Sequence, residues 1–282
     1  MSQTYKATGI NLKGSPLGET DRLVTVLTSE WGIVRAIAPG ARKYKSRLRG
    51  RSELFVVNNL LIVKGRSLDK IIQADTIYTY PGLSQDLGKL AAAQYLAELI
   101  LYLALSEQSQ LELYELLNEH LRRIERLANQ QSVYPYLAQA VYHILAIAGV
   151  APQVQACCLS QKLLSPNFAT LNWQVGFSFE RGSIVDLNLA ELTHKSENNR
   201  KSGDILKSIN YKVNALELTL LQQLSCQALP QVEVLVDSKA NHLSLDAAWI
   251  RVERILREYA QYYCGRSLRS ADLVDNLYLV EF

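Results

Sequence analysis

The spacing of apolar and polar residues along the chain changes once, near residue 80. Up to that point, short β-branched and apolar runs of strand length alternate with turn residues. After Pro81 and Gly82 the apolar residues recur about every 3.6 positions, which is the period of an amphipathic helix. We therefore predict an α+β protein with a small β domain over 1–80 and a mainly α-helical domain over 81–282.

Five strands are predicted in the first domain, over 5–12, 21–28, 33–38, 53–64 and 69–77, with a turn over 14–18. No convincing helix pattern separates them. Short strands at this density are typical of a small closed β-barrel, and an OB-fold fits their number.

Helices are predicted over 86–106, 109–128 and 133–148, and they suggest a bundle. The second helix begins with a capping-box pattern, Ser109 to Glu112, and the third stops at Gly149. An irregular insert follows over 153–201, with short strands expected over 168–177 and 183–189 and a polar loop over 194–201. Helical pattern resumes over 204–226 and again near the C-terminal end.

Positive charge is concentrated between two of the predicted strands. Seven cations lie in seventeen residues that contain no Asp or Glu: Arg35, Arg42, Lys43, Lys45, Arg47, Arg49 and Arg51. The chain has a formal charge of +3, and without these seven it would hold 23 basic and 27 acidic residues. A charge run of this kind is commonly a solvated loop. Here Gly40 and Gly50 bracket it and Tyr44 lies inside it, which favours a polyanion partner, most commonly nucleic acid.

Composition narrows the class of protein further. The longest apolar stretch, 87–105, contains Lys89, Gln94 and Glu98, so we expect a buried helix and no membrane partner. The first residues lack the apolar core of a secretory signal, and the four cysteines do not form a disulfide framework, so a cytoplasmic location is expected. Phosphate-binding glycine motifs, paired metal-binding histidines and clustered nuclease carboxylates are not found, so no enzyme activity is predicted.

Two hypotheses about function follow from the basic run. In the first, the run together with Lys64 and Arg66 neutralises DNA phosphates, while Tyr44 or Trp31 stacks on bases, giving sequence-independent binding that weakens with salt. In the second, the barrel is an RNA-binding or ribosome-binding module, or an accessory subunit of a nucleic-acid enzyme. The run alone does not separate DNA from RNA.

Several segments resemble the bacterial recombination mediator family RecO. They are YKATGI from Tyr5, GETDRL from Gly18, WGIVRA from Trp31, GARK from Gly40 with RLRG from Arg47, and RILREYAQYYCGRSL from Arg254. The resemblance implies an OB-fold followed by a helical domain. It also implies a non-catalytic, nucleoid-associated protein that binds single- and double-stranded DNA and anneals complementary strands. With RecR, and sometimes RecF, such a protein loads RecA onto DNA coated by single-stranded-DNA-binding protein.

The resemblance carries two further expectations about sites. Many members hold zinc between two CxxC pairs, but here Gln161 stands where a thiolate is expected after Cys158, and 177–189 contains no cysteine. Cys157, Cys158 and a distant His194 do not make a four-ligand site, so no zinc or other cofactor is expected. For the coating protein's acidic C-terminal tail, two cationic helix faces are candidates, which are equally consistent with solvated faces: Arg122, Arg123 and Arg126, and Arg251, Arg254 and Arg257.

Overall fold

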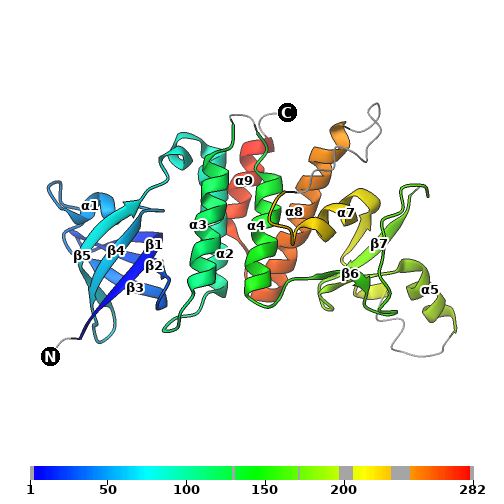
Figure 1. The fold of residues 1–282 in the computed structure, drawn as a ribbon, viewed down its shortest axis with the longest axis horizontal. Helices are drawn as coiled ribbons and strands as arrows, with labels where there is room; N and C mark the ends of the chain where they lie inside the picture. The colour runs from blue at the N-terminus through cyan, green and yellow to red at the C-terminus, as the bar shows by residue number, and fades with distance from the viewer. Residues whose placement is uncertain (1–2, 129–130, 171, 197–205, 230–241, 280–282) are drawn as a thin grey trace. The chain divides into compact units, whose positions relative to one another are not determined.

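The computed structural model describes residues 3–128, 131–170, 172–196, 206–229 and 242–279 (Figure 1). By their internal contacts these residues form two compact units. The first comprises residues 1–133 and 268–282, and the second comprises residues 134–267. The β domain is thus packed together with helices that follow residue 80, and with a helix from the C-terminal end of the chain.

A closed five-stranded barrel forms the N-terminal part of the first unit. Its strands are β1 (Thr4–Leu17), β2 (Asp21–Thr28), β3 (Gly32–Ala38), β4 (Val57–Val63) and β5 (Asp69–Tyr78), joined in the order β1-β2-β3-β5-β4. All pairs are antiparallel except β3 with β5. This arrangement confirms the predicted OB-fold and the predicted α+β class.

The inward-facing side chains of the barrel are small and β-branched, as the alternating pattern indicated. Val24, Val26, Val34 and Ala36 from β2 and β3 meet Ile62 and Ile71 from the opposite wall. Such residues fill a five-stranded barrel without leaving a channel. The barrel is therefore a rigid core that carries its function on its outer surface and loops.

Two strand ends differ from the prediction. The turn expected over 14–18 was wrong, because β1 continues to Leu17 and pairs with β2 as far as Asp21. The chain then reverses at Gly18, which has a φ of 59°. The strand expected from residue 53 begins only at Val57, because Phe55 has a φ of 60° and its N–H donates to the Asn11 carbonyl. The basic run also contains a short helix, α1 (Leu48–Arg51).

Helices complete the first unit. A 3-10 turn η1 (Pro81–Gln85) leads into α2 (Leu87–Leu103), which packs against α3 (Leu111–Glu125) and α9 (Arg269–Leu279). The Asp86 carboxylate caps α2 by accepting a hydrogen bond from the Lys89 N–H at 2.9 Å. Helices α2 and α3 closely match the predicted ranges 86–106 and 109–128. In the part of the chain that the structure describes, no helix is long and apolar enough to span a membrane.

Lys89 is buried in spite of its charge, and it joins α2 to the end of α3. Its ammonium group donates to the carbonyl of Glu125 at 3.1 Å and to that of Leu127 at 2.6 Å. The last carbonyls of a helix have no partner within the helix, and the negative end of the helix dipole attracts a cation. Lys89 therefore satisfies the C-terminal end of α3.

The connection between α2 and α3 lies directly on the β2–β3 turn. Gly32 forms a bridge with Ser106, and the Ile33 N–H donates to the Leu105 carbonyl at 2.9 Å. The predicted capping box at Ser109 was wrong. The Ser109 hydroxyl donates to the Ser29 carbonyl of the barrel at 2.8 Å, and Gln110 precedes the helix without a side-chain cap.

The second unit combines helices with a sheet. Helix α8 (His242–Cys264) packs on α4 (Tyr134–Ile147) and on α7 (Ala215–Gln223). Beside them lies a four-stranded sheet in the order β6-β8-β7-β9. The strands are β6 (Gln153–Cys157), β7 (Gln174–Ser178), β8 (Ser183–Val185) and β9 (Tyr211–Asn214), and Phe177 contacts Tyr259 of α8.

Parts of the predicted insert differ from the structure. The strands expected over 168–177 and 183–189 are present but shorter, whereas β6 and β9 were not predicted. The polar loop expected over 194–201 was wrong at its start, because helix α5 (Leu187–Ser196) continues to residue 196. Residues 197–201 lie outside the described ranges. The helix expected over 204–226 begins only at Ala215, where Asn214 and Glu217 form a capping box.

Replacing Lys89 by Met tests its role at the end of α3. We expect Lys89→Met to lower the free energy of unfolding by about 1–3 kcal/mol, because two carbonyls in a buried site lose their donor. The control is Lys162→Met at an exposed lysine, which should change stability by less than about 0.5 kcal/mol. Urea unfolding of both variants measures the difference, and equal midpoints would show that Lys89 has no such role.

Candidate nucleic-acid interface

The basic run forms a loop and a short helix at the end of β3. Arg42, Lys43, Lys45, Arg47 and Arg49 are exposed, and Arg51 is half-buried within 3.7 Å of the Asp75 carboxylate. Tyr44 is 85% exposed, and the Arg49 guanidinium lies 5.7 Å from its ring centre. The loop therefore presents several cations and one aromatic ring to solvent on a single short segment.

Asp21 anchors this loop to the barrel. Its carboxylate accepts the Gly40 N–H at 2.7 Å and the Thr20 hydroxyl at 2.8 Å. The hydrogen bonds from Gly40 and Thr20 lower the pKa of Asp21; desolvation opposes them, and the charges of Lys43 and Lys70 lower the pKa further. Gly40 has a φ of 62°, as a glycine-specific turn requires, and the Arg42 side chain donates to the Gly18 carbonyl at 2.8 Å. The start of the loop is thus fixed although its side chains are exposed.

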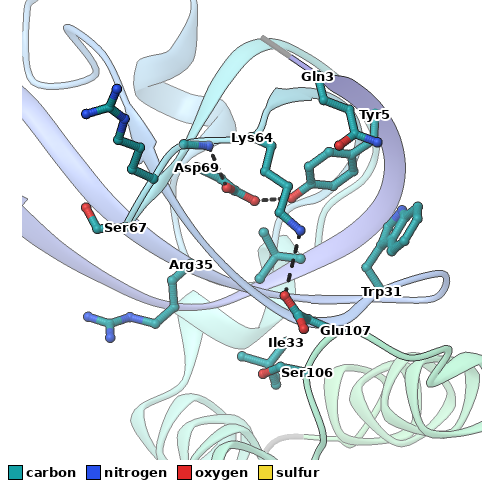
Figure 2. Close-up of a pocket in the computed structure, with 13 residues that line it drawn as sticks. Gln3, Tyr5, Trp31, Ile33, Arg35, Lys64, Ser67, Asp69, Ser106 and Glu107 are labelled. Carbon is teal, nitrogen blue, oxygen red and sulfur yellow. Dashed lines mark hydrogen bonds and ion pairs between the residues drawn. The ribbon is translucent and has the colours of Figure 1, made fainter.

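A pocket of about 370 Å³ opens on the same barrel (Figure 2). Arg35, Lys64 and Arg66 line it, together with Trp31 and Tyr5. The sequence placed all three cations in the interface, and the structure brings them together around an aromatic pair. The Tyr5 and Trp31 ring centres are 5.4 Å apart, with the planes inclined at 63°.

Asp69 organises the wall of this pocket. Figure 2 shows its carboxylate accepting hydrogen bonds from the Tyr5 hydroxyl and, at 3.0 Å, from the Gly65 N–H. Partial burial, and then the hydrogen bond to Asp69 and its charge, raise the pKa of Tyr5, so the phenol remains protonated. Tyr5 and Asp69 were not among the predicted site residues. No local signal identifies them, because closure of the barrel brings them together across 64 residues.

Strand β3 connects the pocket to the basic loop. Arg35 lies on its outer face at the pocket, and Ala38 at its end leads into the loop. Exposed Lys70 belongs to β5, opposite Ile37 of β3, and its charge reaches Asp21 beside the loop. Lys70 was also missed by the sequence analysis, although its place in an alternating strand pattern could have suggested it. Along β3, Arg35 lies three residues before Ala38, a distance of about 10 Å, so the cations of the pocket and those of the loop form one extended track.

Comparison with known proteins identifies the family. The family model described as Recombination protein O N terminal matches residues 1–80, and Recombination protein O C terminal matches residues 84–272. The chain belongs to the RecO family. DNA repair protein RecO of Gloeothece citriformis is 62% identical over 283 residues, covering 100% of both chains. The RecO proteins of a Nostoc species and a Synechocystis species are 53% and 48% identical, covering at least 97% of each chain.

This result confirms the resemblance and places the chain among DNA repair proteins of the RecO family. The two family models meet near the boundary predicted at residue 80, whereas the compact units divide the chain elsewhere. The predicted domain limits therefore describe family segments, and α2, α3 and α9 pack with the OB-fold segment.

On α3, the first candidate set of helix arginines remains available to solvent. Arg122 and Arg126 are exposed, and the Arg122 guanidinium lies 5.7 Å from the Tyr78 ring centre. Arg123 is half-buried and pairs with Glu119 at 2.9 Å. Arg122 and Arg126 therefore face solvent, and their role as a partner surface stays a prediction.

On α8 the second set does not form one cationic face. Arg257 is buried and lies 3.5 Å from the equally buried Glu253. Arg251 pairs with buried Glu217 at 2.7 Å and donates to the Lys212 carbonyl at 2.8 Å. Arg254 is exposed. Arg251 therefore links α8 to α7 and β9, whereas Arg257 pairs with a carboxylate of its own helix, because buried carboxylates require partners.

The region where many RecO proteins hold zinc has a different donor set here. The Cys157 sulfur lies beside the end of β8 and accepts N–H groups of Asp186 at 3.3 Å and Leu159 at 3.4 Å. Burial is the largest influence and would raise the pKa of Cys157, but these hydrogen bonds and two from Ser160 together lower it. Within the described ranges no three His, Cys, Asp or Glu side chains come together as metal ligands. These residues do not fit a four-ligand zinc site.

The anchoring role of Asp21 can be tested with two substitutions that carry the same charge. Asp21→Ala removes the acceptor for the Gly40 N–H, whereas Asp21→Asn keeps an acceptor oxygen. We expect the Ala variant to bind DNA several-fold more weakly than the Asn variant, because its loop must become ordered on binding. Fluorescence anisotropy measures the affinities, and amide exchange of Gly40 should be faster in the Ala variant. Equal affinity and exchange would contradict the anchor.

The carboxylate of Asp21 should also titrate below its usual value of about 3.9. Because its folded pKa is lowered, its contribution to stability is present above that value and is lost as the pH falls through the folded pKa. Carbon-13 NMR of the aspartate carboxyl groups measures the midpoint. A midpoint at or above the usual value would show that the anchor is absent in solution.

Proposed function

We propose that this RecO-family chain is a non-catalytic DNA-binding protein that acts in recombinational repair by binding and annealing DNA strands. The observation that carries the proposal is the extended cationic track on the barrel. It runs from Lys64 and Arg66 past Arg35 and Lys70 to the anchored loop with Lys43. An OB-fold that offers cations and aromatic rings on its outer surface is suited to nucleic acid.

The chemistry of the track favours contact with phosphates over reading of bases. Exposed arginine and lysine side chains neutralise phosphates whatever the base sequence, and the released counterions favour binding. A surface that screens the charge of two strands at once also lowers their mutual repulsion. Annealing of complementary strands then follows without a catalytic residue.

The remaining functions in the proposal rest on membership of the RecO family. We infer that the chain acts with RecR, and with RecF, to load RecA onto DNA coated by single-stranded-DNA-binding protein. The exposed Arg122 and Arg126 of α3 suit the acidic C-terminal tail of that coating protein. Such work belongs in the cytoplasm, at the nucleoid.

The proposed function does not depend on zinc. Gln161 stands where a second thiolate is expected after Cys158, which supports a metal-free fold in this region. We expect purified protein to contain less than about 0.1 zinc per chain, and its unfolding midpoint to be unchanged by a chelator. Elemental analysis and thermal unfolding test this, and stoichiometric zinc with a lowered midpoint after chelation would overturn it.

The proposal is tested by removing five loop cations together, Arg42, Lys43, Lys45, Arg47 and Arg49, each to Ala. Binding of DNA should weaken more than about tenfold at low salt, and annealing should fall with it. For a single strand, the slope of log K against log salt concentration is negative, and each lost phosphate contact should reduce its magnitude by about 0.7. Fluorescence anisotropy at several salt concentrations measures both quantities.

A matched control removes five exposed cations of the second unit instead: Lys162, Arg181, Lys207, Lys212 and Arg266. This variant has the same net charge as the loop variant and should keep its affinity and slope within about twofold. If both variants lose affinity equally, net charge alone explains binding. If the folded loop variant binds and anneals as before, the proposed interface is wrong.

A further inference from the structure

The Trp31 side chain is held in one orientation at the mouth of the pocket. Its indole Nε1 donates to the Lys6 carbonyl at 3.1 Å, and the Tyr5 ring packs against it edge to face. Even so, 43% of the side chain remains exposed. A tryptophan fixed by its polar atom, with so much of its surface open, is suited to stacking against another flat ring.

The cations beside Trp31 complete a second recognition element. Arg35, Lys64 and Arg66 line the same pocket, and Figure 2 shows Lys64 and Trp31 facing the same opening. A volume of about 370 Å³ lies in the range of small-ligand pockets. One nucleotide offers a flat base and a phosphate within a few ångströms of each other. An aromatic ring and cationic groups that line one pocket match both of its parts.

Glu107 is the unexpected member of the pocket. Its carboxylate lies 3.7 Å from the Lys64 ammonium group, and its backbone has a φ of 63°. This conformation is unfavourable for a residue other than glycine or asparagine, and strain of this kind is concentrated at functional sites. The Glu107 N–H donates to the Trp31 carbonyl at 3.0 Å, which fixes the residue at the pocket mouth. An exposed carboxylate thus lies beside Lys64, where a phosphate would bind.

We propose that this pocket takes a single unpaired nucleotide of a DNA strand. The base stacks on Trp31, and its phosphate replaces the Glu107 carboxylate at Lys64. A base within a duplex is already stacked and paired, so it can stack on the indole only after unpairing. The pocket therefore selects single strands, whereas the basic loop accepts both forms of DNA. This inference rests on the proposed function and adds the determinant of strand preference to it.

The base-stacking half is tested with Trp31→Ala, with Phe168→Ala as the control at another exposed aromatic residue. Anisotropy with a thymidine oligonucleotide and with a duplex of equal length gives the ratio of the two affinities. We expect Trp31→Ala to weaken single-strand binding about 5-fold or more, and duplex binding by a smaller factor. Trp31→Phe should restore most of the ratio, because it restores an aromatic face. A ratio unchanged in Trp31→Ala would overturn the proposal.

The phosphate-exchange half is tested with Glu107→Gln, with Glu115→Gln as the control for the same loss of charge at an exposed site on α3. We expect Glu107→Gln to bind the single strand about 2- to 5-fold more tightly at low salt, because the competing carboxylate is gone. The control should change affinity by less than that. Equal effects of the two substitutions, or none, would overturn the exchange at Lys64.

Two comparisons are needed. The first shows whether the pocket inference or the proposed function fails, and the second shows whether the nucleotide belongs to DNA or to RNA. If the loop variant loses all DNA binding while Trp31→Ala behaves like Phe168→Ala, only the pocket inference fails. If the unaltered protein neither binds nor anneals DNA, the proposed function itself fails. A uridine oligonucleotide of equal length tests RNA, and a Trp31-dependent affinity seen with RNA alone would overturn the assignment to DNA.

Discussion

The arrangement of the first unit depends on the absence of a side chain at Gly32. The α2–α3 connection lies so close to the β2–β3 turn that a Cβ on Gly32 would overlap the Leu105 carbonyl oxygen, and its φ of 64° also favours glycine. This contact aligns the Ile33 and Glu107 N–H groups with carbonyl acceptors. The barrel, the helices behind it and the mouth of the Trp31 pocket are therefore positioned by one close backbone contact.

The two ends of the proposed interface are built on different physical grounds. At the basic loop, a fixed backbone anchor at Asp21 supports side chains that remain exposed, so attraction is long-ranged and sensitive to salt. At the pocket, Tyr5, Asp69 and Trp31 are held by mutual contacts, so recognition depends on shape. Strand β3 joins the two, which lets one rigid element set the distance between a nonspecific and a selective contact.

Local sequence predicted those features that local forces determine. The alternation of apolar residues located β2 and β3 almost to the residue, because each strand buries one face in the barrel. The seven cations of the basic run likewise indicated that this segment is exposed to solvent. Contacts between distant segments were not predictable in this way. The Ser109 hydroxyl binds a barrel carbonyl instead of capping α3, and the Tyr5–Asp69 contact exists only once the barrel closes.

The same reason explains the cationic helix faces. Helical spacing alone placed Arg251 and Arg257 beside Arg254 as solvent-facing residues. The structure buries Arg257 and directs Arg251 to a buried carboxylate, because α8 packs on neighbouring elements along more than one side. A periodic pattern shows which residues share a helix face, whereas the number of faces that become covered is decided by the tertiary fold.

The return of α9 to the first unit has a consequence for synthesis of the protein. Leu268, Ala271 and Val274 are buried, and the Ser270 N–H donates to the Glu98 carboxylate of α2 at 2.8 Å. Helix α2 is apolar on nearly all sides, yet α9, which covers part of it, is synthesised more than 160 residues later. At a synthesis rate of roughly 5–20 residues per second, α9 becomes available to α2 on the order of 10 s after α2 is made. During that interval an apolar surface of the nascent chain is open to chaperones.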